Sequence, residues 1–425
     1  MTIFKWGAAT LALMTTFPLM AAPKAPFTLE HVVTLSRHGV RPQTDTDALN
    51  KATGKTWPEW TVQDGHLSGH GYAGILHQGA YQIAHWREAG LPIGTKCPQP
   101  EQVFAWSSPL QRTRATAQAL LDGMFPGCGL AAGSTQEKLD PLFQSVDMGL
   151  SQPNKDIVKQ QITARTGSAD DLNKRYQPAI SLLRATVCAE TPSSCEFLNA
   201  PWKLVEKEHG VSLKGPLSPG STIGETIRLQ YSEGLPLSQV AFGHARNARE
   251  VAALMALHAA KYDLVSDTPE LARHGGTLLM SQLAAALTAG TTASAPENPS
   301  LKAPLVMFVG HDTNIAQIQT MLQMNWQLGD YPRNDIPPGG SLAFERYRDT
   351  HSGERYVRLT FSAMSLDQWR HLSPLTTDAP PLIEEYHDSH CQQTAVGWLC
   401  PLDHIVEKMT RSQVAGITSP QPLFH

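Results

Sequence analysis

The sequence predicts an α/β sheet whose chain is interrupted by a helical insertion. Twice, a short β-rich run is followed directly by apolar residues at helical spacing, which is the pattern of a strand–helix unit. Between residues 151 and 290 helical stretches dominate, and few segments favour strands. We therefore expect residues 23–150 and 268–425 to form the α/β domain, and residues 151–267 to form a smaller helical domain.

Three segments are expected to be buried strands, because each is short and rich in β-forming residues. They are residues 31–36, 102–107 and 304–309. Pro109 is well placed to open the helix that follows the second strand. The apolar positions that share a helix face are Leu110, Ala117, Leu120, Leu121 and Met124 after the second strand, and Ile315, Ile318, Met321 and Leu322 after the third. In the insertion, helices are expected at 180–187, 226–232 and 248–258, and residues 291–303 are expected to be a surface loop.

Residues 1–22 are expected to be an export signal that is cleaved. Lys5 is the only charged residue ahead of a mostly apolar run, residues 6–20, and Ala21-Ala22-Pro23 supplies small residues for cleavage. A membrane anchor is the alternative, but the run is shorter than the about 20 apolar residues that span a bilayer. After cleavage, the chain is expected to have no membrane contact.

The charge balance narrows the possible partners. Hydrophobic residues make up 41% of the chain and charged residues 17%, which is ordinary for a soluble enzyme. The formal net charge is −4, so nothing overall attracts the chain to nucleic acid or to an anionic membrane. Affinity for an anion must come from a local cluster of positive groups.

The six cysteines are consistent with an oxidising compartment. Cys188 and Cys195 are close in sequence, as are Cys391 and Cys400, and each pair could close a short surface loop. Cys97 and Cys128 would then remain, although six cysteines allow about fifteen connectivities. None of the cysteines forms a C-x-x-C motif, so the sequence does not favour zinc or thiol redox chemistry.

The strongest candidate site is the loop Ser36-Arg37-His38-Gly39-Val40-Arg41, which follows the first strand. Ligands of open α/β sheets bind beyond the carboxyl ends of the strands. Arginine forks match phosphate oxygens, and a neutral imidazole can attack phosphorus. A loop with two solvated arginines is the alternative. The tripeptide Arg-His-Gly of residues 37–39 recurs at residues 273–275. There it follows a helical stretch, so we interpret that second copy as a chance match.

Two further segments could contribute to the same site. Gly310-His311-Asp312-Thr313-Asn314 joins the third strand to a helix whose N-terminus favours an anion. Asp312 could exchange a proton with the leaving oxygen and with water, although it is also a reasonable helix cap. Arg112 or Arg114, in the first turn of the helix after the second strand, could reach the same anion, and a solvated helix face is the better interpretation for Arg114.

Other motifs carry little weight. Residues 69–74 match G-x-G-x-x-G, but no buried strand precedes them and no acidic residue follows about twenty positions later. His66 and His70 lack the glutamate of a zinc-binding H-E-x-x-H motif. The chain contains neither a G-x-S-x-G elbow nor a phosphate-binding P-loop.

Together, the loop around His38, the Arg112 segment and the distant His311-Asp312 pair resemble the histidine acid phosphatase family, most closely its bacterial periplasmic phytases. Residues 64–72, 108–120, 140–143, 235–239 and 336–339 are similar to the same branch, and the resemblance covers nearly all of the mature chain. It implies a phosphoglycerate-mutase-like mixed sheet flanked by helices, a smaller helical domain, and a cleft between them.

The resemblance also implies roles. His38 is the expected nucleophile and Asp312 the expected proton donor. The residues expected to hold the phosphate are Arg37, Arg41, Arg112 and His311, and those expected to contact the substrate or order water are Thr44 and Glu225. Disulfides Cys97–Cys128, Cys188–Cys195 and Cys391–Cys400 are implied, and no metal or cofactor.

The expected function is therefore hydrolysis of phosphate monoesters, preferably phytate (myo-inositol hexakisphosphate), by a monomer in the periplasm. A glucose-1-phosphatase or a broad-range acid phosphatase is the alternative on the same machinery, and a periplasmic phosphate-ester binding protein is the alternative from another class. One departure bears on substrate preference. Pro42 directly follows Arg41, Gln43 stands where the family's R-H-G-x-R-x-P loop has proline, and Asp45 adds a negative charge near the expected pocket.

Overall fold

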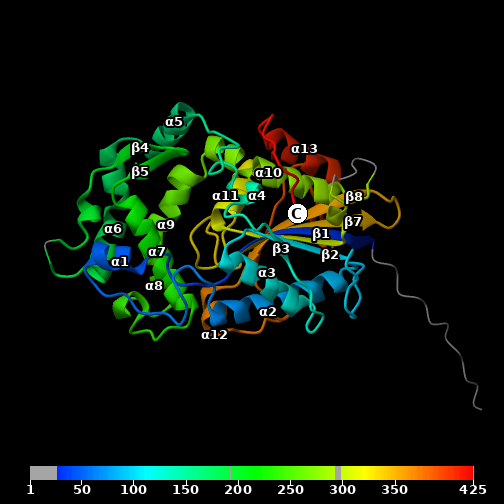
Figure 1. Cartoon of the computed structure of the whole chain (residues 1–425), viewed down its shortest axis with the longest axis horizontal. Helices are drawn as coiled ribbons and strands as arrows, with labels where there is room; N and C mark the ends of the chain where they lie inside the picture. Colours follow the sequence, from blue (N-terminus) through cyan, green and yellow to red (C-terminus); the bar gives the residue numbers. More distant parts are fainter. Residues whose placement is uncertain (1–25, 192, 292–297, 425) are drawn as a thin grey trace, which may run out of the picture.

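The computed structural model describes residues 26–191, 193–291 and 298–424, so the expected export signal lies outside the described residues. The chain forms two parts (Figure 1): a sheet with helices on both faces, and a mainly helical part beside it. Among the described residues, none of the helices combines the length and apolar character needed to cross a membrane.

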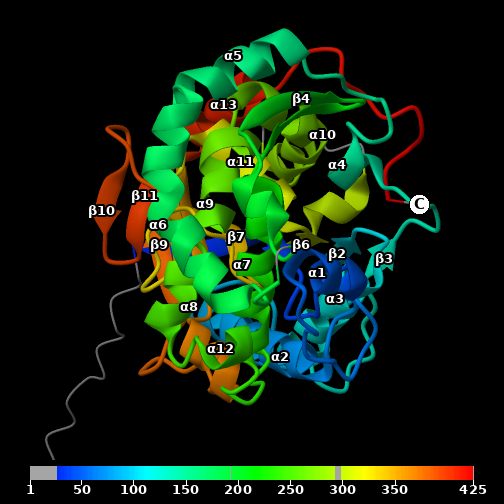
Figure 2. The ribbon, with the colours of Figure 1, turned by 90° about the vertical axis from the view of Figure 1, so that its left-hand side faces the viewer.

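The sheet is mixed, as expected. Its order is β10-β11-β8-β7-β1-β6-β2-β3, with β9 paired to β8. The parallel part consists of β1 (Phe27–Arg37), β6 (Leu305–Gly310), β2 (Val103–Ser107) and β3 (Gly133–Ser134). The antiparallel part consists of β7 (Ser341–Asp349), β8 (Arg355–Ala363), β9 (Leu382–Glu385), β10 (Gln392–Thr394) and β11 (Gly397–Pro401). The three expected strands are β1, β2 and β6, and Figure 2 shows β10 and β11 at the opposite edge from β3.

Both faces of the central strands are buried, which explains why their sequences are almost continuously apolar. In β6, Val306 and Phe308 pack into the core on one face, while Leu305 and Met307 pack into the core on the other. His31 of β1 is buried at 2% exposure, and burial, followed by the charge of Arg346, lowers its pKa to about 3.

Helices cover each face of the sheet (Figure 1). One core contains side chains of α2 (Gly69–Glu88), α3 (Gln111–Met124) and α12 (Leu366–His371). The other contains side chains of α10 (Pro269–Thr288), α11 (Asp312–Leu322), α13 (Leu402–Ser412) and the short α4 (Pro141–Gln144). The helix expected from Pro109 begins at Gln111, because Leu110 keeps an extended backbone.

The helical part contains α1 (Thr46–Thr53), α5 (Lys155–Thr166), α6 (Ala169–Val187), α7 (Leu217–Ser232), α8 (Ala248–Leu254) and α9 (Ala256–Lys261). The helix expected at 248–258 is divided at Met255. This part also contains a hairpin, β4 (Lys203–Lys207) and β5 (Gly210–Lys214), that the sequence pattern did not predict. Helix α1, from the first α/β segment, lies here too, since the Cys195 amide donates to the Ala52 carbonyl at 2.9 Å. The domain boundaries therefore stay a prediction.

One short element modifies the expected loop. Residues 299–302 of the expected loop form a 3-10 turn, η4 (Pro299–Lys302), and residues 292–297 lie outside the described part.

The cysteines form the three disulfides that the family resemblance implied. Cys97–Cys128 spans 31 positions, Cys188–Cys195 spans 7 and Cys391–Cys400 spans 9. Among the described residues there is no free cysteine. A disulfide stabilises the fold by restricting the unfolded chain, and this effect grows with the length of the closed loop.

The disulfides should therefore contribute unequally to stability. Replacing Cys97 and Cys128 together by serine should cost about 4 kcal/mol, whereas the same change at Cys188 and Cys195 should cost about 2 kcal/mol. Urea unfolding followed by circular dichroism measures both losses. Equal losses, or the reverse order, would contradict this account.

Candidate active site

Strand pairing brings three distant segments of the chain to one edge of the sheet. In the parallel pair β1–β6, Arg37 is in register with Gly310, and in β2–β6 Ser107 is in register with Val309. Hydrogen bonds continue past the strand ends, from the His38 amide to the Gly310 carbonyl at 3.2 Å. The residues that follow these strands therefore lie together at the carboxyl edge, where open α/β sheets bind ligands.

His38 is buried and held in one tautomer. Its Nδ1 lies 2.9 Å from the carbonyl oxygen of Gly39, which can only accept, so Nδ1 carries the proton and Nε2 keeps a lone pair. Burial is the largest cause that holds the pKa of His38 well below its usual range, and the charge of Arg41 is the next. The ring is therefore neutral and oriented, with a lone pair on Nε2.

Two glycines allow helix α2 to clamp the loop. A Cβ on Gly39 would lie 2.8 Å from Ile75, and a Cβ on Gly71 would lie 2.2 Å from the carbonyl oxygen of Val40. The amide of Gly39 also donates to the hydroxyl of Thr116 on α3 at 3.0 Å. The G-x-G-x-x-G match at 69–74 therefore serves close packing against the loop.

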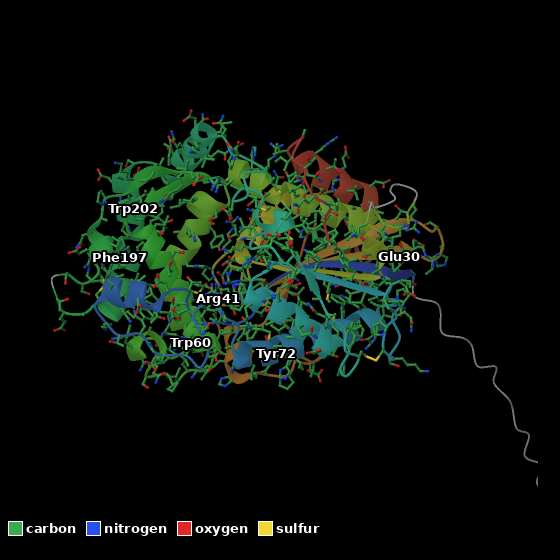
Figure 3. All side chains as sticks on the ribbon, in the orientation of Figure 1. Glu30, Arg41, Trp60, Tyr72, Phe197 and Trp202 are labelled. Atoms are coloured by element: carbon green, nitrogen blue, oxygen red, sulfur yellow. A yellow bond between two sulfur atoms is a disulfide. The ribbon has the colours of Figure 1, made fainter. Side chains whose placement is uncertain are left out.

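Three arginines lie close enough to His38 for their positive charges to lower its pKa, namely Arg41, Arg37 and Arg112. Each has a buried Nε without a hydrogen-bond partner. Among the described residues, neither Arg41 nor Arg112 forms an ion pair with a carboxylate. Figure 3 shows Arg41 where the helical part meets the sheet. Burial, then the charge of Arg41, lowers the pKa of Arg112 to about 10. The arrangement fits an anion that accepts several N–H groups.

Arg37 forms an ion pair with Glu225 of α7. Its Nη2 lies 2.5 Å from Glu225 Oε1, and Glu225 also accepts from Arg228 on the same helix. Arg228 in turn lies 2.5 Å from Asp335, and both side chains are almost fully buried. Glu225, expected to contact the substrate or order water, therefore contacts two arginines, and the chain Asp335–Arg228–Glu225 fixes Arg37.

Asp312 lies on the other side of Arg37. Its Oδ2 is 3.2 Å from Arg37 Nη2, and its side chain is 22% exposed. Burial, the largest single effect, raises the pKa of Asp312, but the positive charge of Arg37 together with that of further groups such as Lys261 outweighs burial and holds the pKa well below the usual range. The alternative of a helix cap does not apply, because the N-cap position of α11 is His311.

His311 faces the same site. Its ring centroid is 5.7 Å from that of His38, and its Nε2 lies 3.0 Å from the hydroxyl of Ser108. Burial, followed by the charge of Arg112, lowers its pKa to about 3. Thr44 is exposed and lies beside Arg112, since a Cβ on Gly65 would be 3.6 Å from both side chains.

Sequence reasoning did not assign roles to several residues of this site. They are Ser108, Arg228, His258, Tyr262 and Asp335. Tyr262 hydrogen-bonds Asp312 and begins a π-helical turn, Tyr262–Ser266, a feature that is frequent at functional sites but has no sequence signature. Ser108 directly follows β2, so its position at the carboxyl edge of the sheet was the available signal.

The residues that the sequence analysis did not favour as site residues lie outside this site. Arg273 and His274 belong to α10, where Arg273 donates to the Ser412 carbonyl at 2.9 Å. His70 is bonded to the Trp369 carbonyl at 2.7 Å, and Arg114 is exposed on α3.

Comparison with known proteins agrees with the geometry. The family model of the histidine phosphatase superfamily (branch 2) matches residues 28–362. Phytase AppA of Escherichia coli (strain K12) is 30% identical over 91% of this chain and 92% of its own length. A glucose-1-phosphatase of Salmonella typhimurium is also 30% identical, over 89% of this chain and 91% of its own.

Solved structures give the same result. The crystal structure of Klebsiella sp ASR1 phytase superposes with a TM-score of 0.85 and 36% identity, covering 93% of this chain and 100% of that one. Hafnia alvei phytase in complex with tartrate gives 0.84 and 34%, covering 94% and 100%. The family and the fold class expected from the sequence are both confirmed. This chain belongs to the histidine phosphatase superfamily, branch 2, and is a phosphatase enzyme.

Proposed function

We propose that this chain hydrolyses phosphate monoesters through a phosphohistidine on His38, and that phytate is its preferred substrate. The observation that carries the proposal is a neutral histidine, fixed by Gly39, among three arginines whose Nε atoms are buried. Arg37, Arg41, Arg112 and His311 bind the transferring phosphoryl group, and their positive charge and N–H donors stabilise its equatorial oxygens.

In the first step, Nε2 of His38 forms a bond to phosphorus while the ester P–O bond breaks. Asp312 supplies the proton that the leaving oxygen takes. In the enzyme without substrate, the carboxyl of Asp312 is ionised because it is paired with Arg37. A bound phosphate competes for Arg37 and adds negative charge beside Asp312, and both changes raise the pKa of this carboxyl. Substrate binding therefore favours protonation of Asp312, which can then act as the proton donor.

In the second step, water attacks phosphorus and the N–P bond breaks. Asp312, now ionised, takes the proton from the water, and orthophosphate leaves. Tyr262, which hydrogen-bonds Asp312, orients the carboxyl during both transfers. Ser108 keeps His311 in place through the hydrogen bond to its Nε2.

The preference for phytate rests on similarity to proteins named phytase, and glucose 1-phosphate is the second candidate because a relative is named glucose-1-phosphatase. The carboxylate of Asp45 is used within the fold, because it caps α1 by accepting a hydrogen bond from the Ala48 amide at 2.8 Å. Gln43 donates to Thr46, which supports the loop where the family has proline. Release rates from phytate, glucose 1-phosphate and p-nitrophenyl phosphate, compared as kcat/KM, distinguish the two candidates.

The proposal includes export to the periplasm and action as a monomer. Three disulfides support an oxidising compartment. Periplasmic location is tested by fractionation of the source cells, and the monomer by light scattering. Membership of a phosphatase family favours turnover over the binding-protein alternative.

Replacing His38 by alanine should lower kcat for p-nitrophenyl phosphate by at least about 10⁴-fold, because the nucleophile is lost. The matched control is His274→Ala, from the second copy of the Arg-His-Gly tripeptide, which should keep full activity. Rapid quench into alkali should trap a phosphohistidine in the wild type and in His274→Ala but not in His38→Ala, since this adduct is acid-labile. Stoichiometric binding of the ester without turnover would support the binding protein instead.

The effect of Asp312→Asn should depend on the leaving group. An alkoxide leaving group needs a proton, so kcat for glucose 1-phosphate or phytate should fall by about 10²–10⁴-fold. p-Nitrophenolate leaves without a proton, so phosphorylation by p-nitrophenyl phosphate should fall much less in a single-turnover burst. An equal loss with both substrates would exclude Asp312 as the proton donor.

The pH profile should show the effect of the arginines. Because burial and positive charge lower the pKa of His38, the imidazole stays neutral well below pH 6.5, and kcat/KM should fall only in strong acid. Arg112→Gln removes one positive charge, so the pKa of His38 and His311 should rise and the acid limb should move to higher pH. Arg114→Gln, two residues along the same helix and exposed, is the control.

Hydrolysis should need no metal ion, because the proposed steps use only protein groups and water. Prolonged dialysis against EDTA should leave kcat within about two-fold of its starting value. Loss of activity that a divalent ion restores would contradict the mechanism.

A further inference from the structure

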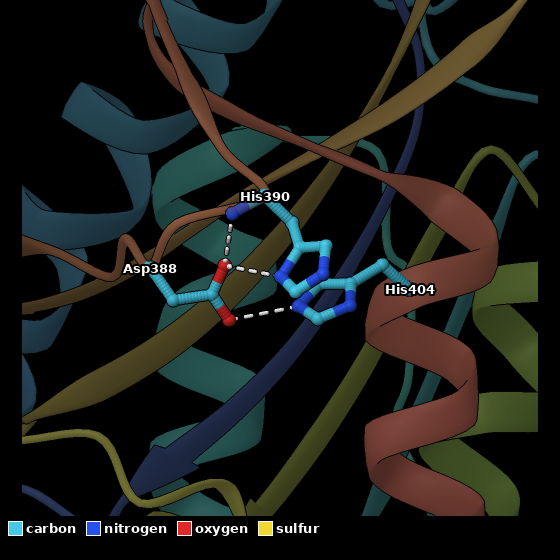
Figure 4. Close-up of side chains that lie close together, drawn as sticks. All are labelled: Asp388, His390 and His404. Atoms are coloured by element: carbon cyan, nitrogen blue, oxygen red, sulfur yellow. Dashed lines mark hydrogen bonds and ion pairs between the residues drawn. The ribbon is translucent and has the colours of Figure 1, made fainter.

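A second cluster of chemically active side chains lies away from His38. Asp388 and His390 follow β9, and His404 lies in the first turn of α13 (Figure 4). One potential ligand atom from each residue falls within 4.8 Å of the other two. His404 Nε2 is 2.7 Å from Asp388 Oδ2, and His390 Nδ1 is 3.5 Å from Asp388 Oδ1. Two ring nitrogens and a carboxylate therefore converge on one point of the surface.

The local structure fixes these three residues. The disulfide Cys391–Cys400 joins the residue after His390 to the end of β11, which leads directly into α13. The amide of His390 donates to Asp388 Oδ1 at 2.9 Å. The hydroxyl of Tyr386 donates to Asp388 Oδ2 at 2.6 Å. The carboxylate is therefore oriented by the chain on both sides of it.

The two imidazoles lie face to face, with ring centroids 4.1 Å apart and planes 22° from parallel. Hydrogen bonding to the carboxylate explains the position of His404, but it leaves His390 at a longer distance on a side chain that is 62% exposed. Figure 4 shows both rings presenting a nitrogen to the same carboxylate. A cation on the carboxylate side of the rings, in line with their in-plane nitrogen lone pairs, would be bound by all three groups at once.

The donor set matches a borderline-soft divalent ion. Two histidine nitrogens and one carboxylate oxygen, with water as the fourth ligand, form a common tetrahedral zinc environment. Zn–N bonds of about 2.0 Å place tetrahedral donors about 3.3 Å apart, so the exposed His390 ring must turn out of its stack with His404 to aim its lone pair at the ion. The nearby Lys408 belongs to the same hydrogen-bond network but does not bond the carboxylate directly, since its Nζ donates to the Tyr386 hydroxyl at 2.8 Å and that hydroxyl donates to Asp388.

We propose that Asp388, His390 and His404 form a zinc-binding site that links the β9–β10 segment to helix α13. The strands β8 and β7 separate β9 from β1, about 14 Å at the usual strand spacing, so the site is distinct from the one around His38. The bound ion stabilises this edge of the sheet and takes no part in hydrolysis.

The test is equilibrium dialysis of the untagged, disulfide-bonded protein against ZnCl₂ at 1–100 micromolar, with bound zinc measured by mass spectrometry. His390→Ala and His404→Ala remove one proposed ligand each. His351→Ala is the matched control, because His351 is 82% exposed and lies 3.8 Å from a single carboxylate, that of Asp349. Phosphatase activity measured without added metal checks that every variant is folded.

The wild type and His351→Ala should bind one zinc per chain, and both ligand variants should bind at least about ten-fold more weakly. Zinc should also raise the thermal midpoint of the wild type and the control but not of the ligand variants. The proposal is overturned if the wild type binds no zinc in this range, if either ligand variant binds as tightly as the wild type, or if His351→Ala loses binding as well. Zinc held by the histidines around His38 would survive both ligand substitutions and would give the second of these results.

Discussion

The site depends on the parallel pairing of β1 with β6. Register aligns Arg37 with Gly310, so the two strands end at the same level of the sheet and the residues that follow them must lie side by side. About 270 residues separate these strands in sequence, and the helical part lies within that interval. Insertion of this part leaves the pairing intact because both strands are buried on both faces. The chemistry is thus located by backbone hydrogen bonds, before any side chain is considered.

Charge compensation around Arg37 is the second constraint. A fully buried guanidinium requires a partner, and Glu225, with Arg228 and Asp335 behind it, supplies one from the helical part. Within the described part of the chain Arg41 and Arg112 have no such partner, so their positive charge remains available to an anion. Arg37 is therefore fixed in position by its ion pairs, whereas the charges of Arg41 and Arg112 are not compensated by an ion pair among the described residues. The same positive charge, added to burial, keeps His38 and His311 unprotonated.

Short-range patterns in the sequence predicted the central strands and the loops that directly follow them. The strands at 31–36, 102–107 and 304–309 were found because both of their faces are apolar, and the site loops were found because they follow those strands. The hairpin β4–β5 was missed, since it is exposed on one face and carries lysines in both strands. No sequence pattern predicts an ion pair between residues far apart in the chain, so the partners of Glu225 became visible only in three dimensions. Arg112, ranked above Arg114 from the sequence, is half-buried with a buried Nε, whereas Arg114 is exposed on the same helix.

The buried neutral histidines have a consequence for proton linkage. In the unfolded chain a histidine binds a proton below about pH 6.5, whereas His31 and His311 in the folded chain resist protonation down to about pH 3. Stability is therefore lost as pH falls below 6.5, by about 2 kcal/mol for each of these groups at pH 5. A constraint on the unfolded chain does not titrate in this range, so the three disulfides continue to oppose unfolding in acid. Tolerance of acid thus depends on the disulfides, and a chain that lacked them would be least stable in acid.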